Sequence, residues 1–286
     1  MTALKTAGTL PNLIIIGAMK CGTTSLHYYL DKHPDIKMSQ PKELDFFFDQ
    51  GHWSKGIDWY RSHFTGKYLV HGEASPKYSF YPVMRDVPQR MYEIVPEAKL
   101  IYVVRDPIER FVSHYVHDCS TGVETREFCD VVAEVNDDSR YILRGKYFMQ
   151  LEQFLKFYPR SSILVVDQHD LQRNRDATCR RIFEFLGVDS SFTHPSFAKV
   201  RYRGNQRRLK NIVGRRLAEL PTMKMLSRLS PSLHWRVEWL VTLPFSRIVA
   251  RPTVSDDMKK QLIEHFQKDV NDLRNLAGLQ LETWCL

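Results

Sequence analysis

The chain has 286 residues, of which 43% are hydrophobic and 12% are aromatic. This length and composition exclude an intrinsically disordered or low-complexity protein, and they suffice for a packed interior. We expect a single α/β domain over residues 1–286, because a unit of this size with insertions commonly folds around one core.

The N-terminal segment Met1 to Pro11 has no apolar signal core, and no run of about 18 uncharged apolar residues follows it. The expectation is therefore a soluble, cytoplasmic protein. The cysteines are odd in number, widely spaced and without a C-x-x-C pair, which predicts free thiols and no structural zinc. They are Cys21, Cys119, Cys129, Cys179 and Cys285.

The first strong signal is an apolar run, Leu13 to Ile16, that breaks into a loop bounded by Gly17 and Gly22. Helical spacing from Ser25 to Leu30 follows, so the loop amides are expected to converge on an anion at the start of a helix. Lys20 lies two residues before the second glycine, whereas the pattern G-x-x-x-x-G-K-[ST] places it directly after. The loop is interpreted as a phosphate loop of a different kind from the ordinary ATP loop, and a merely structural turn is the alternative.

Cys21 lies inside this loop. A small side chain packed under the turn is favoured over a nucleophilic thiol.

The segment from Gln40 to Phe48 places two acids, Glu43 and Asp45, beside three consecutive phenylalanines. Loss of solvent beside an aromatic wall raises the pKa of a carboxylate, which suits a general base. The alternative is an ordinary acid at a strand edge.

Further strands are predicted at Tyr68 to His71 and Leu100 to Val104. The segment Gly72 to Tyr78 follows the first of these and is expected to line the same cleft. Arg105 follows the second, at the carboxyl end where open α/β sheets bind ligands, and Ser113 comes one to two helical turns later. An arginine fork with a hydroxyl can hold a second phosphate. In the structural alternative, Arg105 pairs with Asp106 or Glu109.

A fourth strand and several helices complete the pattern, and their alternation predicts a parallel sheet covered by helices on both faces. The strand is Ser162 to Val166; the helices are Asp86 to Val95, Lys146 to Phe157, Ala177 to Leu186 with Gly187 as C-cap, and a helix with Ser255 as N-cap that runs to about Leu276.

The segment 197–252 mixes prolines, basic residues and apolar clusters without a sustained period, so we expect a cap or substrate-side insertion there. Residues 199–251 hold thirteen Lys or Arg residues against Glu219 and Glu238. A local charge of this size indicates an anionic partner: a nucleotide, an acidic glycan, a phospholipid headgroup or nucleic acid. A solvated basic face is the alternative.

In this order, the phosphate loop, Pro-Lys-Glu-Leu-x-Phe-Phe from Pro41 and Arg-Asp-Pro-x-x-Arg-x-x-Ser-x-Tyr from Arg105 resemble the sulfotransferase family. The resemblance is to the branch with heparan sulfate and bacterial carbohydrate sulfotransferases. It covers Leu13 to about Gly187, and more loosely Arg251 to Trp284. It implies a P-loop, nucleotide-kinase-like fold.

The resemblance also implies the donor, 3′-phosphoadenosine 5′-phosphosulfate (PAPS), with 3′-phosphoadenosine 5′-phosphate (PAP) as product and no metal. Glu43 matches the catalytic base, and Lys20 matches the lysine that stabilises the leaving phosphate. The acceptor would be a hydroxyl or amine of a carbohydrate or glycolipid. The donor-binding residues implied are Lys20, Cys21, Gly22, Thr23, Thr24 and Ser25 for the phosphosulfate, Arg105 and Ser113 for the 3′-phosphate, and Arg201 and Arg203 in the nearest candidate for a Lys-Gly-Arg donor loop.

The sequence departs from the heparan-type pattern where that branch has His at position 45 and Lys at position 74, since this chain has Asp45 and Ala74. Lys77 is a candidate replacement for the missing lysine. Two other functions stay open: an ATP-dependent small-molecule kinase, with Asp106 or Asp167 as magnesium ligand, and a non-catalytic polyanion-binding module. Residues 199–251 are a candidate peripheral membrane contact, and nucleic acid is not the expected partner.

Overall fold

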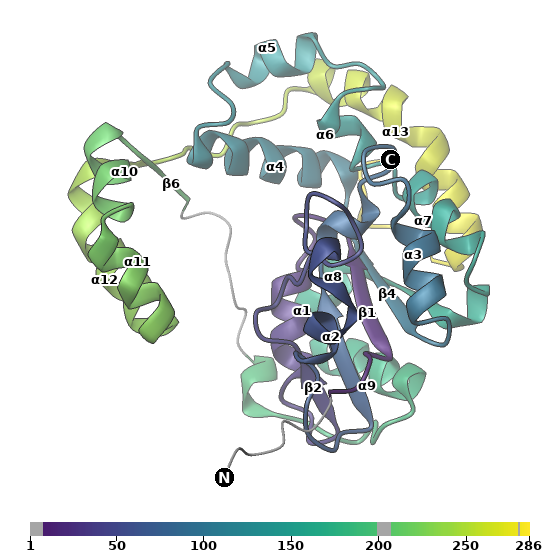
Figure 1. The fold of residues 1–286 in the computed structure, drawn as a ribbon. Coiled ribbons are helices and arrows are strands. Elements are labelled where there is room, and N and C mark those ends of the chain that lie inside the picture. The colour runs from purple at the N-terminus through teal and green to yellow at the C-terminus, as the bar shows by residue number, and fades with distance from the viewer. Residues whose placement is uncertain (1–7, 199–206, 280) are drawn as a thin grey trace.

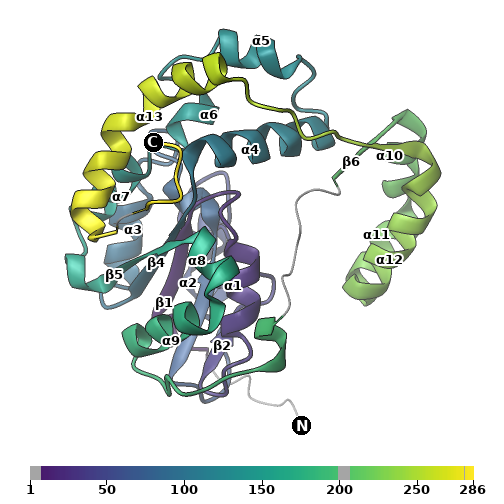
Figure 2. The same ribbon diagram turned by 180° about the vertical axis from the view of Figure 1, so that it is seen from behind.

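The protein is described by a computed structural model for residues 8–198, 207–279 and 281–286 (Figure 1). Five parallel strands form one sheet with the order β2-β3-β1-β4-β5, flanked by helices (Figures 1 and 2). The predicted α/β fold with a central parallel sheet is therefore confirmed. The strands are β1 (Leu13–Gly17), β2 (Ile36–Met38), β3 (Val70–Ala74), β4 (Lys99–Val104) and β5 (Ile163–Asp167).

The strand predicted at Tyr68 to His71 begins and ends later, at Val70–Ala74. Tyr68 and Leu69 are 39% and 65% exposed, whereas all five residues of β3 are buried between β1 and β2. Burial in the middle of the sheet decides where the strand lies, so Gly72 to Ala74, which were expected to follow the strand, are part of it. The short strand β2 was not predicted, because three residues give too little pattern.

Helices lie close to each of the predicted helical ranges, whereas the helices Gly56–Arg61, Phe128–Ala133, Arg140–Leu143 and Gln168–Arg173 were not predicted. Three caps are visible, of which those at Ser255 and Gly187 were predicted. Asp106 accepts hydrogen bonds from the amides of Ile108 and Glu109, Ser255 accepts from the Met258 amide, and Gly187 has φ 78°. The helices are α1 (Thr23–Leu30), α2 (Gly56–Arg61), α3 (Val87–Ile94), α4 (Pro107–Thr121), α5 (Phe128–Ala133), α6 (Arg140–Leu143), α7 (Tyr147–Leu155), α8 (Gln168–Arg173), α9 (Arg175–Leu186) and α13 (Asp256–Ala277).

Residues 208–248 form an arm that stands away from the sheet (Figures 1 and 2). Two antiparallel strands make its root, and three helices make its outer part. The sequence showed no sustained period here because the helices are short and two of them start at a proline, which fits only the first turn. The elements are β6 (Arg208–Lys210), α10 (Ile212–Ala218), α11 (Pro221–Leu229), α12 (Pro231–Thr242) and β7 (Ser246–Ile248).

No helix in the described parts of the chain is long and apolar enough to cross a membrane.

Candidate active site

The loop between β1 and α1 has the backbone geometry of an anion cradle. Gly22, directly before α1, has φ 96°, and Lys20 has φ 71°, so the chain turns through left-handed conformations before the helix begins. The first amides of a helix have no partner within it and point outward. Gly17 allows close approach below the loop, since a Cβ there would lie 2.2 Å from Ser79 Oγ.

A cavity of about 810 Å³ opens over this loop, and it brings together motifs that are far apart in sequence. It lies where β1 and β4 end, at the carboxyl edge of the sheet, as the parallel topology requires. The residues predicted for the site that line it are Lys20, Gly22, Thr23, Thr24, Ser25, Glu43, Arg105 and Ser113.

Cys21 is the loop residue that does not line the cavity. Its amide donates to the Ala18 carbonyl at 3.2 Å, and its fully buried thiol lies 3.5 Å from the Tyr147 hydroxyl. Burial raises the pKa of the thiol to about 11. The side chain therefore packs under the turn, which was the favoured interpretation, and this geometry disagrees with its inclusion among the donor-binding residues. Arg201 and Arg203 lie outside the described residues.

Lys20 carries the most perturbed charge facing the cavity. Burial, and next the charge of Arg207, lower the pKa of its ammonium to about 7. A bound anion would favour the charged form. A phosphate bound on the loop would therefore raise the pKa of Lys20 and favour its protonated form.

Arg105 faces the cavity and also has a structural partner. Its Nη2 lies 2.7 Å from Glu109 Oε2, and Arg251 Nη2 lies 2.6 Å from the same oxygen. The structural alternative is thus correct for Glu109, whereas Asp106 caps α4. Because the single carboxylate of Glu109 pairs with two guanidinium groups that line the cavity, those of Arg105 and Arg251, a net positive charge remains there.

Glu43 does not have the apolar surroundings that the sequence predicted. Its side chain is 44% exposed and pairs with Lys42 at 2.7 Å, while Phe46, Phe47 and Phe48 are buried in the core. The expectation that the aromatic residues desolvate Glu43 is wrong, because their rings turn inward while the acid faces the cavity.

A fully buried acid lies instead on β3, next to the central strand: it is Glu73. It is fully buried, and burial raises the pKa of its carboxyl group to about 7. It accepts hydrogen bonds from Tyr60, Ser75 and Tyr78 at 2.5, 2.9 and 2.9 Å.

Two of these partners continue to the segment that carries Glu43. The Asp45 amide donates to Ser75 Oγ at 3.0 Å, and the Phe46 amide donates to the Tyr78 hydroxyl at 2.9 Å. Glu73 therefore holds the Glu43 segment in place from behind.

We expect Glu73→Gln to remove a pH dependence of stability. A carboxyl pKa raised from about 4.5 to about 7 favours the folded state fully below pH 4.5, and that contribution is lost as pH rises through 7. The free energy of unfolding of the wild type, relative to the variant, should fall by up to about 3 kcal/mol over this interval. Urea unfolding at a series of pH values measures the difference; a constant difference from pH 4 to pH 8 would contradict it.

Asp45, one of the departures from the heparan-type pattern, meets Lys77, the candidate replacement for the missing lysine. Lys77 lines the cavity and is ion-paired with Asp45. The sequence could not show this pair, because 32 residues and a strand of the sheet separate its members.

Three further basic side chains line the cavity and were not predicted: His117, Arg144 and Arg207. Arg207 Nη1 lies 2.6 Å from His117 Nδ1, and burial lowers the pKa of His117 to about 4, so its ring is neutral near pH 7. Within the described ranges neither arginine has a salt bridge to a carboxylate. The spacing of His117 four residues after Ser113 on one helix face was the available signal for it.

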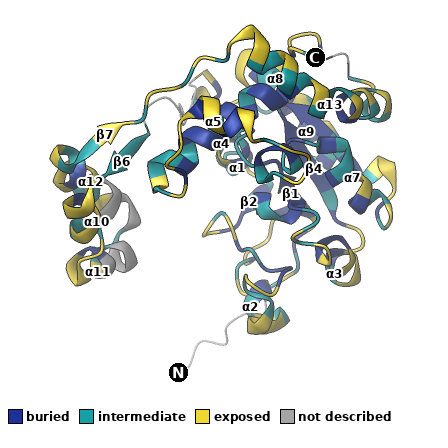
Figure 3. Ribbon diagram, turned by 90° about the horizontal axis from the view of Figure 1, so that it is seen from above, coloured by how far each residue is buried: buried dark blue, intermediate teal, exposed yellow. Residues whose placement is uncertain are grey.

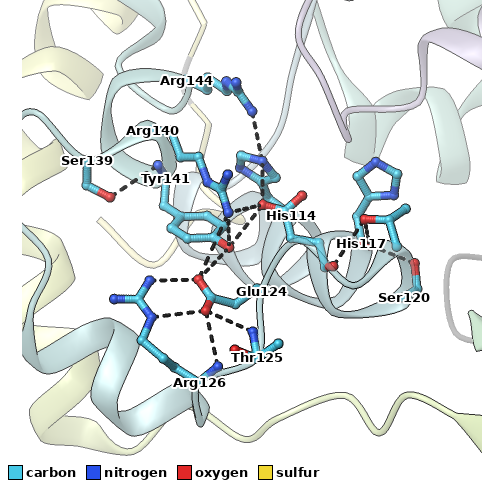
Figure 4. A network of polar contacts seen from close by, with 12 residues as sticks. His114, His117, Ser120, Glu124, Thr125, Arg126, Ser139, Arg140, Tyr141 and Arg144 are labelled. Carbon is cyan, nitrogen blue, oxygen red and sulfur yellow. Dashed lines mark hydrogen bonds and ion pairs between the residues drawn. The ribbon is translucent and has the colours of Figure 1, made fainter. Parts of the chain in front are cut away.

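Arg144 is held from behind by a buried network (Figure 4). Its Nη1 donates to His114 Nε2 at 2.9 Å, and its guanidinium lies 4.1 Å above the Phe80 ring. The network continues from His114 to Asp118, 3.4 Å away, and Asp118 pairs with Arg140 at 2.8 Å. Asp118 pairs directly with Arg140, so Arg144 brings to the cavity wall a charge with no salt bridge to a described carboxylate.

Comparison with known proteins places these features in a family context. A sulfotransferase domain model matches residues 10–212. The bifunctional heparan sulfate N-deacetylase/N-sulfotransferase 2 of Bos taurus is 32% identical over 204 residues, which cover 64% of this chain and 23% of that protein. The heparan sulfate glucosamine 3-O-sulfotransferase 3B1 of Mus musculus is 33% identical over 198 residues, 66% of this chain and 49% of that protein. The chain thus spans less than a quarter of the first relative and about half of the second.

Among solved structures, a sulfotransferase from Alicyclobacillus acidocaldarius superposes with a TM-score of 0.67 at 25% sequence identity. The match covers 96% of this chain and 99% of that one. The overall fold is therefore shared with a known protein over almost the whole chain.

Proposed function

Since this chain belongs to the sulfotransferase domain family, we propose that it transfers a sulfuryl group from PAPS to a hydroxyl or amine of a carbohydrate acceptor. The observation that carries the proposal is the single cavity wall that contains both the phosphate loop and Glu43, together with Arg105 and Ser113. The donor's phosphosulfate would lie on the loop from Lys20 to Ser25, and its 3′-phosphate against Arg105 and Ser113. The relatives named above act on heparan sulfate, which supports a carbohydrate acceptor.

In the proposed reaction, Glu43 removes the proton of the acceptor as its oxygen or nitrogen bonds to sulfur. The bond between sulfur and the bridging oxygen breaks, and PAP leaves with the electron pair. Lys20 and the loop amides stabilise the negative charge that develops on the 5′-phosphate. Arg105 and Ser113 act at a distance from the sulfur, so their contribution is positioning of the donor.

We assign Lys77 the place of the lysine that is absent at position 74. It lines the same cavity as Glu43, and its pairing with Asp45 fixes the ammonium at the wall. Replacement of His by Asp at position 45 and the shift of the lysine to position 77 are then one coupled change.

An acidic carbohydrate fits the cavity better than a neutral one. Arg144 and Arg207 line the cavity but are not among the residues assigned to donor binding. No described carboxylate forms a salt bridge with either of them. Cations of this kind are stabilised when a ligand supplies the missing anion.

The kinase alternative requires an aspartate available for magnesium. Asp106 accepts from the amides of Ile108, Glu109 and Cys285, the last at 2.6 Å. Asp167 accepts from the His169 amide and from Trp284 at 3.3 Å. Both candidates are engaged in helix caps and tertiary contacts, which favours the sulfotransferase.

Calorimetric titration with PAP, beside ATP with magnesium, tests the donor assignment. Tight binding of PAP without metal is the expected result. A preference for ATP would return the loop to kinase chemistry, and PAP binding without transfer of labelled sulfate to any glycan would favour the polyanion-binding module.

Arg105→Ala is expected to weaken PAP binding by about 10- to 100-fold, which corresponds to the loss of one charge-assisted hydrogen bond. The turnover number at saturating donor should change little. Calorimetry gives the first quantity and sulfate transfer the second. Unchanged PAP affinity would show that the Arg105 pair with Glu109 is only structural.

A further inference from the structure

The arm exposes an unusual concentration of apolar side chains. Of the 14 exposed large hydrophobic residues in the described ranges, nine lie on the arm. They include Ile212 at 72%, Met225 at 61% and Leu240 at 62% exposure. In Figure 3 the ribbon of the arm, where it is described, is mostly in the colours of exposed and intermediate residues. Apolar patches of this kind mark interaction sites in folded proteins.

Leu233, Trp239 and Leu240 on α12 point outward. Leu233 and Leu240 are spaced by seven residues, so they share one face, and exposed Arg236 lies between them on that face. Trp239 is 47% exposed beside it, whereas the polar Thr242 is 4% exposed and faces inward. The helix thus presents apolar and basic groups to the outside together.

The positive charge of the arm indicates which kind of partner would bind to its exposed apolar side chains. Residues 207–251 hold ten Lys or Arg residues and only two acids, and one of the acids, Glu238, is already paired with Lys210. Two copies of the chain meeting through this surface would bring like charges together, whereas anionic lipid headgroups would compensate them. Aromatic and aliphatic residues mixed with arginine are typical of helices that lie in a membrane interface.

We propose that the arm is a docking surface for the anionic face of a lipid bilayer. α12 lies on the membrane with Leu233, Trp239 and Leu240 in the interface, and Arg236 contacts the headgroups.

The root of the arm connects this surface to the cavity, because Arg207, Val249 and Arg251 line the cavity next to β6 and β7. Resting on the proposed sulfotransferase function, this placement makes the acceptor a carbohydrate carried by a lipid.

Co-sedimentation with vesicles tests the surface. The whole chain should sediment with vesicles that contain phosphatidylglycerol, and it should stay in the supernatant when the vesicles contain only phosphatidylcholine. Trp239→Ser combined with Leu240→Ser should lower the partition constant at least about tenfold, and Arg236→Gln with Arg247→Gln should lower it about fivefold per charge.

Matched controls lie on the body of the protein. Leu69→Ser with Val83→Ser removes two side chains of 65% and 70% exposure away from the arm, and it should leave the partition constant unchanged. If the Leu69→Ser, Val83→Ser control lowered the partition constant as much as Trp239→Ser with Leu240→Ser, the proposal would be overturned. Absence of vesicle binding by the wild type would also overturn it. Sedimentation velocity would then show whether the arm is instead a dimer contact, which Trp239→Ser would dissociate, or whether the chain is a monomer.

PAP calorimetry on the same variants separates this proposal from the proposed function. Unchanged PAP affinity with lost vesicle binding supports the docking surface. If the wild type binds vesicles but not PAP, the donor assignment is wrong and the proposed docking surface is still supported.

Discussion

Glu43→Gln should lower the turnover number by about 100- to 10,000-fold, the range expected for loss of a positioned general base. The amide cannot accept the proton of the acceptor, but it preserves the size of the side chain at the cavity wall. Donor affinity should change little, because Glu43 is assigned to the acceptor side. Initial rates of sulfate transfer with a heparan-type oligosaccharide, together with PAP calorimetry, measure both quantities.

The control for this variant is Glu97→Gln, which removes an exposed carboxylate outside the cavity and should leave both values unchanged. A parallel loss of PAP affinity in Glu43→Gln would instead assign Glu43 to donor binding. Since Lys42 pairs with Glu43, Lys42→Met should alter the turnover number far less than Glu43→Gln if the pair only orients the acid.

Lys20→Met should lower the turnover number by about 100- to 1,000-fold, comparable with removal of one donor that stabilises a developing anion. Methionine keeps the length and apolar stem of the lysine. The charge on the leaving phosphate would then be stabilised by the loop amides alone. The effect is measured at saturating PAPS, where differences in donor affinity no longer contribute.

Lys20→Met should also abolish a proton uptake. In the free wild type the Lys20 pKa is about 7, and the anionic donor favours the ammonium, so PAP binding above pH 7 takes up a proton and its affinity falls as pH rises. Calorimetry in two buffers of different ionisation enthalpy measures this uptake. Persistence of the full uptake in Lys20→Met would show that another group titrates.

The motifs predicted most of the site because the parallel topology left little choice. Local pattern identifies β1 and β4 as buried strands, and the residues that follow the carboxyl ends of parallel strands must meet at one edge. Lys20 and Arg105 are therefore neighbours of one cavity, and the chemistry of the loop follows from its glycines and lysine. The caps at Ser255 and Gly187 were equally local, and they formed as expected.

Other features were decided by contacts between distant segments. Pairing of Lys77 with Asp45, and of Arg251 with Glu109, joins residues far apart in the sequence, so no spacing indicates it. The orientation of the phenylalanines at 46–48 likewise depends on how they pack in the core. Because their rings turn inward, Glu43 faces the open cavity.

By itself, the sequence determined the fold class, the phosphate loop and most of the residues at the cavity, because strand burial, helix caps and glycine turns are local physical preferences. Tertiary structure decided which carboxylate is desolvated, since burial of Glu73 depends on β1 and β2 on either side of β3. It also decided that the basic segment forms an outward-facing arm, because short helices in a row have no periodicity that fixes what their apolar faces will contact.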